Sequence, residues 1–152
     1  MTATAPTVQN LIDSEYVAGE TGATEPILNP GTGEVMAHAP LSSAGDVDRA
    51  VDAAERAFES WSTTPPSERA RALLRLADAL EEHAGELATL ESDNAGKPIA
   101  AMRDDEIPFA ADNLRFFAGA ARTLQGPTAG EYLSGYTSMI RREPVGVIAQ
   151  IA

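Results

Sequence analysis

The sequence predicts an α/β fold, and three observations carry this prediction. Two hairpin patterns open the chain, helical periodicity with start and stop signals occupies its middle, and an almost continuous apolar run covers 144–152. Such a run is typical of a strand buried on both faces of a parallel sheet. Because a parallel strand needs a crossover and a neighbouring strand, we expect this chain to be the first part of a larger domain.

The first 40 residues favour short strands. Residues 1–10 show no periodic pattern and are expected to form a flexible tail. Apolar pairs around a polar turn at 13–15 predict a first hairpin over 11–17. A second hairpin is expected over 27–37, because Pro30-Gly31-Thr32-Gly33 has strong turn chemistry.

Helical signals follow. Ser43 with Asp46 three residues later indicates a capped helix start, and the apolar spacing then continues until two consecutive prolines at 65–66. A single long helix is expected over 67–90, and Gly96 provides its stop signal.

A third helix is expected to begin near Pro108, with Phe109, Phe116 and Phe117 read from the pattern as core residues. After it, residues 131–142 have the composition of extended chain. The order of elements is therefore two hairpins, three helices, an extended arm and one buried strand, which is not a complete layered architecture.

Composition excludes several classes of function. The 152 residues include 11 basic and 23 acidic side chains, a formal charge of −12, which disfavours nucleic acid and anionic membrane as partners. The chain contains no cysteine, so disulfides, thiolate metal sites and a cysteine nucleophile are absent from these residues. Two isolated histidines predict no metal site. No signal peptide or membrane span is visible, and a cytoplasmic location is expected.

One charged run could contribute to a site. Asp104-Asp105-Glu106 precedes the third predicted helix, where acidic side chains complement the helix dipole. The alternative is an acidic wall that attracts a cationic substrate group. Neither a nucleophile with a neighbouring base nor a metal-binding set can be argued from the residues alone.

Four segments together resemble the aldehyde dehydrogenase superfamily in their order and spacing. They are Asn29-Pro30-Gly31-Thr32-Gly33-Glu34-Val35, Asp46-Val47-Asp48-Arg49-Ala50-Val51, Leu90-Glu91-Ser92-Asp93-Asn94-Ala95-Gly96-Lys97-Pro98 and Arg141-Arg142-Glu143-Pro144-Val145-Gly146-Val147-Ile148. The sequences at 105–108, 112–119 and 130–140 are similar to those of the aminoaldehyde branch, closest to γ-aminobutyraldehyde dehydrogenases. The resemblance implies oxidation of 4-aminobutanal in putrescine degradation, with betaine aldehyde or a semialdehyde as the alternative substrate.

The resemblance also implies an N-terminal fragment of the aldehyde dehydrogenase fold. Hairpins and helices of the cofactor-binding domain would occupy 11–130, part of the oligomerisation arm 131–143, and the first strand of a Rossmann-like cofactor domain 144–152. The family's catalytic cysteine, glutamate and asparagine would lie further along, so this chain carries no catalytic residue and is expected to be inactive alone. Its parent would be a homo-oligomer, a dimer or tetramer. The alternative is a non-catalytic oligomerisation or interaction module.

The resemblance assigns few site residues. Ile151 and Ala152 match the end of the first cofactor-domain strand, near the nucleotide, which is expected to be NAD with NADP not excluded. Asp105, Glu106 and Phe109 match positions that line the substrate tunnel in relatives. Of these, Glu106 is the carboxylate expected to attract the ammonium group of an aminoaldehyde substrate.

Overall fold

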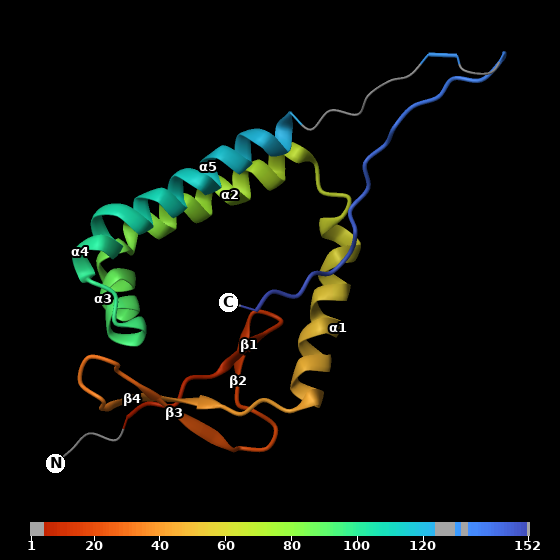
Figure 1. The fold of residues 1–152 in the computed structure, drawn as a ribbon. Helices are drawn as coiled ribbons and strands as arrows, with labels where there is room; N and C mark the ends of the chain where they lie inside the picture. The colour runs from red at the N-terminus through yellow and green to blue at the C-terminus, as the bar shows by residue number, and fades with distance from the viewer. Residues whose placement is uncertain (1–4, 124–129, 132–133, 152) are drawn as a thin grey trace.

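The computed structural model describes residues 5–123, 130–131 and 134–151. Two small antiparallel hairpins lie at one end of the molecule, the helices follow, and the C-terminal segment is extended without helix (Figure 1); the α/β prediction is confirmed. The elements are β1 (Asn10–Ile12), β2 (Glu15–Val17), β3 (Thr24–Leu28), β4 (Val35–Pro40), α1 (Ala44–Trp61), α2 (Pro66–Glu82), α3 (Ala84–Ala95), α4 (Ile99–Ala101), the π-helix η1 (Met102–Glu106) and α5 (Ile107–Arg122).

Both predicted hairpins form. In the first, β1 pairs antiparallel with β2, and Asp13 and Ser14 take left-handed φ values of 55° and 65°, as a tight two-residue turn requires. In the second, the side chain of Asn29 accepts a hydrogen bond from the Gly31 amide at 2.8 Å, which stabilises the turn between β3 and β4. The turn chemistry of the sequence therefore fixes both connections.

The tail prediction for 1–10 is wrong at residues 6–8. His38 of β4 donates its amide to the Pro6 carbonyl at 2.8 Å and accepts from the Val8 amide at 2.9 Å. Thr7 thereby pairs in parallel with His38 and extends the second hairpin by one position. Backbone pairing of this kind leaves no side-chain signal in so short a segment, which is why the sequence pattern missed it.

Helix α1 begins with the predicted capping box. The Ser43 hydroxyl accepts from the Asp46 amide at 3.2 Å, and the Asp46 carboxylate accepts from the Ser43 amide at 2.8 Å. Two amides that the first helical turn leaves without partners are satisfied in this way.

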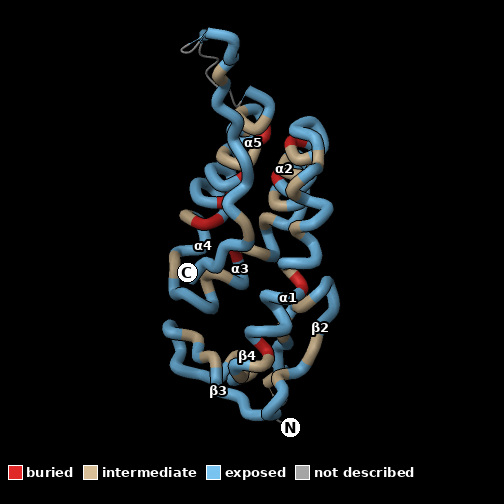
Figure 2. The backbone as a smooth tube through the Cα atoms, turned by 90° about the vertical axis from the view of Figure 1, so that its right-hand side faces the viewer, coloured by how far each residue is buried: buried red, intermediate tan, exposed pale blue. Residues whose placement is uncertain are grey.

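Helices α2 and α5 lie side by side along most of their lengths (Figure 1). Apart from Ile107 at the start of α5, the buried residues of these two helices are small: Ala70 and Ala77 on α2, Ala111 and Ala118 on α5. Small side chains let two helix backbones approach closely and pack ridges into grooves. Figure 2 shows that buried positions are few and that most of the chain is exposed. Buried residues outside the contact of α2 with α5 include Ala37 of β4 and Asp46 and Ala53 of α1.

The sequence predicts one helix over 67–90, but the structure has two, α2 and α3. The chain leaves helical geometry at His83, with φ −97° and ψ 12°, and α3 starts at the next residue. The bend lets Leu87 and Ala88 pack on Met102 and Ile107, so the buried apolar contact compensates for the interrupted helix. Hydrophobic periodicity continues across the bend, and for that reason it could not reveal the break.

The end of α3 contacts the second hairpin. Gly96 stops α3 in the left-handed conformation, φ 72°, as predicted. A Cβ atom at this glycine would lie 2.9 Å from Cγ of Pro30, in the turn between β3 and β4. The Asn29 side-chain amide donates to Asp93 at 3.3 Å beside it. These contacts fasten the hairpin to the helices.

The strand expected over 144–152 does not form in the described residues: 143–151 contain neither helix nor strand. Val145, Ile148 and Ile151 are 96%, 80% and 102% exposed. A strand needs a hydrogen-bonded neighbour, and none lies beside this segment within the described part of the chain. Ala152 lies outside the described residues.

The arm segment is also without regular structure. Residues 134–142 form no helix and no strand, and Tyr132 and Leu133 lie outside the described residues. Within the part of the chain that the structure covers, no helix has the length and apolar character to cross a lipid bilayer.

Candidate functional site

The predicted substrate-facing residues lie where α4, η1 and α5 follow one another without a break (Figure 1). Two buried side chains, Met102 and Ile107, anchor this stretch to Leu80 and Leu87. Between these anchors the chain widens into the π-helix Met102–Glu106, which the sequence did not predict. Widened turns of this type are frequent at functional sites. Here the widening projects charged residues 103–106 outward, and all four are exposed.

Glu106 does not present a free carboxylate. Lys97 Nζ donates to Glu106 Oε2 at 2.7 Å and lies 3.5 Å from Glu91 Oε1. The hydrogen bond to Glu106 raises the pKa of Lys97, so the ammonium group stays charged and compensates the carboxylate. The expectation that Glu106 attracts a cationic substrate remains a prediction, and this ion pair weakens it.

Asp105 differs from its neighbours. Asp104 is paired with Arg103 at 2.7 Å, and the hydrogen bond from Arg103 lowers the pKa of Asp104. Within the described residues, Asp105 has neither an ion pair nor a hydrogen bond through its side chain, and it is exposed. It is therefore the uncompensated charge of the predicted acidic wall.

Phe109 lies one helical turn after Asp105 and is 70% exposed. The same spacing continues to Asp112 and to Phe116, which is 67% exposed, so acidic and aromatic side chains alternate along one side of α5. The interpretation of Phe109, Phe116 and Phe117 as core residues is wrong for this structure. Asp112 and Phe116 were not among the predicted site residues, although their spacing of three and four from Phe109 was visible in the sequence.

An apolar hollow of about 290 Å³ opens beside the π-helix on the side of α3. It is lined by Leu80, Leu87, Leu90, Glu91, Met102, Glu106, Ile107 and Ala110. Glu106 is the residue that this hollow shares with the charged run, and Phe109 is not among its lining residues. Of the three predicted tunnel residues, Glu106 therefore lines this hollow, whereas Asp105 and Phe109 do not.

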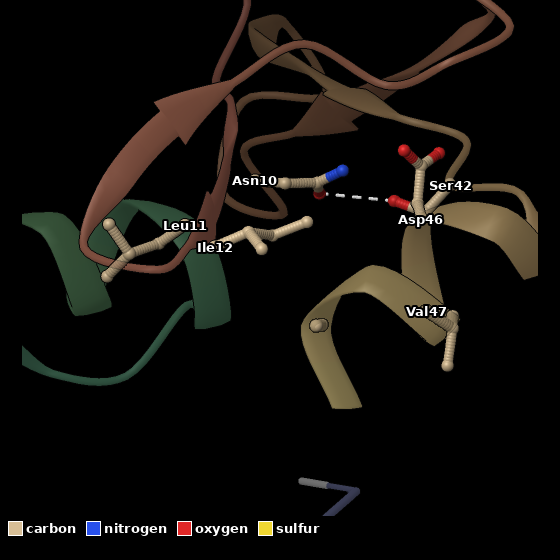
Figure 3. A pocket seen from close by; sticks show the side chains of 7 residues that line it. Asn10, Leu11, Ile12, Ser42, Asp46 and Val47 are labelled. Atoms are coloured by element: carbon tan, nitrogen blue, oxygen red, sulfur yellow. Dashed lines mark hydrogen bonds between the residues drawn. The ribbon is translucent and has the colours of Figure 1, made fainter. Parts of the chain in front are cut away.

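A second hollow, of about 230 Å³, lies between the first hairpin and the start of α1 (Figure 3). Asp46 is only 2% exposed and accepts from the amides of Ser43 and Glu20 and from the Arg49 guanidinium. The two amides are the largest cause of the lowered pKa of Asp46. Ser42 donates to Asn10 at 3.1 Å across the hollow (Figure 3). This network fastens β1 and β2 to α1 and offers no reactive group.

The predicted cofactor contacts are not assembled. Ile151 is fully exposed in a segment without strand structure, and Ala152 lies outside the described residues. The described residues therefore do not by themselves form a cradle for a dinucleotide. Among them, moreover, no group of three or more His, Cys, Asp or Glu side chains could hold a metal ion.

Comparisons with known proteins agree on one family. Residues 16–152 match the family described as the aldehyde dehydrogenase family. The chain is 41% identical over 145 residues to aldehyde dehydrogenase family 2 member B4 of Arabidopsis thaliana. The aligned region covers 94% of this chain and 27% of that protein. It is 38% identical over 144 residues to the malonate-semialdehyde dehydrogenase of Bacillus pumilus, over 95% of this chain and 29% of the relative.

A solved structure agrees with these relatives. The NAD⁺ complex of an aldehyde dehydrogenase from Bacillus cereus has a TM-score of 0.86 at 37% identity, over 91% of this chain and 28% of that one. The chain therefore spans somewhat more than a quarter of the length of the relatives it matches.

Proposed function

Because this chain belongs to the aldehyde dehydrogenase family, we propose that it forms the N-terminal part of an enzyme that oxidises an aldehyde to a carboxylic acid with NAD. The observation that carries the proposal is the family match over residues 16–152, supported by a backbone that follows solved members of the family. NAD is the proposed hydride acceptor, and the NAD⁺ complex of the Bacillus cereus relative supports this choice.

The chain alone is proposed to be inactive. Its 152 residues contain no cysteine, and a thiolate is the nucleophile of the mechanism that the resemblance implies. In the whole enzyme, this chain is proposed to supply the N-terminal helices, including the side of α5 that carries acidic and aromatic residues. The parent is proposed to be a homo-oligomer, and a cytoplasmic location stays a prediction from the sequence.

The proposed substrate is an aminoaldehyde such as 4-aminobutanal. Support comes from Asp105, an exposed carboxylate without a charged partner in the described part of the chain, and from Phe109 one turn further on. A carboxylate attracts an ammonium group, and an aromatic face accepts both a cation and an alkyl chain. Betaine aldehyde or a semialdehyde is the alternative substrate, and the malonate-semialdehyde relative supports the latter.

A chimeric enzyme tests the proposal. The 152 residues replace the corresponding N-terminal part of the Bacillus cereus relative, and NADH formation from 4-aminobutanal is followed. The chimera is expected to oxidise the aldehyde, whereas the isolated chain is expected to give no NADH above a blank. A folded, NAD-binding chimera that oxidises no aldehyde would contradict the family function, and activity of the isolated chain would contradict its proposed inactivity.

A second candidate function is a non-catalytic interaction module that binds full-length subunits through its arm. The exposed apolar side chains Tyr136, Met139 and Ile140 of this segment favour it, with exposed fractions of 69%, 70% and 56%. Size-exclusion chromatography with a full-length homologue distinguishes the two candidates, because only an interaction module should co-elute with the homologue.

A further inference from the structure

Lys97 is the single lysine of the chain, and all its other Lys and Arg positions are arginines. The chain contains no cysteine either, so the Lys97 side chain is its one primary amine besides the α-amino group, and no thiol accompanies it. Aldehydes condense with primary amines, whereas a guanidinium group stays protonated in proteins and takes no part in this reaction. Lys97 is therefore the side chain of this protein at which an aldehyde would react.

The condensation of an aldehyde with lysine requires the neutral amine. The nitrogen lone pair adds to the carbonyl carbon, and loss of one water molecule then leaves a C=N bond, an imine. An ammonium group has no lone pair, so the rate follows the fraction of lysine that is neutral. A contact that stabilises the ammonium form consequently slows the formation of the imine.

Two carboxylates hold the ammonium group of Lys97. Its Nζ donates to Glu106 Oε2 at 2.7 Å and lies 3.5 Å from Glu91 Oε1. The hydrogen bond to Glu106 raises the pKa of Lys97, and the negative charges of Glu106 and Glu91 act in the same direction. Glu91 belongs to α3 and Glu106 to η1, so contacts to both elements stabilise the charged form of the lysine.

The backbone holds the lysine and its main partner in place. The Lys97 carbonyl accepts a hydrogen bond from the Ser92 hydroxyl at 2.7 Å, which fixes the chain after the end of α3. Met102 and Ile107, on either side of the residues that lead to Glu106, are 8% and 5% exposed and belong to one apolar cluster. The ion pair is therefore positioned by contacts among described residues alone.

We propose that Glu106 and Glu91 protect Lys97 from condensation with aldehydes. The value of this protection rests on the proposed function, because an aldehyde dehydrogenase meets a reactive electrophile at every turnover. The protection itself rests on the contacts of Lys97 within this chain, and it gives Glu106 a role that is independent of any part in substrate binding. The 152-residue protein can thus be tested without dehydrogenase activity.

Reductive alkylation measures the protection. The chain is incubated with butanal and cyanoborohydride, together with Nα-acetyl-lysine as a reference amine in the same solution. Cyanoborohydride donates hydride to the imine carbon and leaves a stable secondary amine, which peptide mass spectrometry quantifies at Lys97. We expect Lys97 to react more slowly than the reference amine, and Glu106→Gln to raise its rate about two- to fivefold, as for the loss of an exposed ion pair. Glu91→Gln should raise the rate less, because this carboxylate lies farther from Nζ.

A matched variant separates the ion pair from general electrostatics. Glu59→Gln removes the same charge from an exposed position of α1, and Glu59 is not among the carboxylates that contact Lys97 in the described structure. Glutamine keeps the shape of glutamate, so a change in rate reports charge and not access to the amine. The proposal is overturned if Lys97 reacts as fast as the reference amine, if Glu106→Gln leaves its rate unchanged, or if Glu59→Gln raises it equally. Aldehyde oxidation by the chimera is measured separately, so the proposed function and this protection can fail independently.

Discussion

Lys97 Nζ lies 2.7 Å from Glu106 Oε2 and joins the end of α3 to the π-helix that precedes α5. The contact has two consequences. It holds the wide turn against α3, and it compensates the carboxylate that the sequence singled out as the ammonium attractor. Asp105, the adjacent residue, keeps an unpaired charge within the described structure. The relationship therefore shifts the expected recognition of a cation from Glu106 to Asp105.

Replacement of Gly96 by alanine should destabilise the protein more than replacement of Gly33. Both glycines have left-handed φ values, 72° and 74°, so each substitution should cost about 1–2 kcal/mol of conformational free energy. Only at Gly96 would the new Cβ meet the rigid ring of Pro30, at 2.9 Å, whereas nothing lies within 4 Å at Gly33. Urea unfolding of Gly96→Ala and Gly33→Ala measures the difference. Equal losses would mean that the hairpin and α3 are not in contact.

Lowering the pH should reduce the folding stability of the protein, because Asp46 becomes protonated. Its pKa is lowered in the folded state, mainly by hydrogen bonds from the Ser43 and Glu20 amides, so folding is favoured by its charged form. The stabilisation is fully present above the ordinary pKa of 3.8 and is lost as pH falls through the lower folded value. Thermal unfolding of Asp46→Asn should therefore differ most from the parent at neutral pH and converge with it in acid. The exposed Asp48→Asn is the control, and a difference for Asp46→Asn that stays constant with pH would contradict the assignment.

Truncation of Ile107 should destabilise the protein far more than truncation of Phe109. Ile107 is 5% exposed in the cluster with Met102 and Ala88, and Ile107→Ala should reduce the free energy of unfolding by about 2–5 kcal/mol. Phe109 is 70% exposed, and Phe109→Ala should change it by no more than about 0.5 kcal/mol. Chemical denaturation of both variants provides the comparison. A large loss for Phe109→Ala would place this ring in the core, as its apolar character alone had indicated.

The local signals of the sequence were reliable where one or two side chains determine the backbone. The Ser43–Asp46 capping box, the Pro30–Gly33 turn and the Gly96 stop all lie where predicted, because each acts through contacts within a few residues. The bend at His83 and the π-helix at Met102–Glu106 depend on packing between segments distant in sequence. Periodicity does not contain that information.

For the predicted site residues, the structure shows only their exposure and their pairing. Asp105 and Phe109 lie on the exposed side of the helix, but the pairing of Glu106 with Lys97 depends on how α3 ends, and no rule of spacing between residues nine apart predicts it. The strand at 144–152 stays a prediction, because the described residues of this apolar run form none. The segment is unpaired in the described residues. Strand formation requires a hydrogen-bonded neighbouring strand, and the residues of the segment itself do not determine whether one is present.

The most direct test of the account is the substrate preference of the chimeric enzyme. The kcat/KM for 4-aminobutanal is divided by that for butanal, which has the same length and no charge, for the parent chimera, Asp105→Asn and Glu106→Gln. We expect a ratio above one that falls about three- to tenfold in Asp105→Asn and less than about twofold in Glu106→Gln, since Lys97 already compensates Glu106. A ratio that neither variant changes, in a chimera that oxidises butanal normally, would contradict the assignment of cation recognition to this helix.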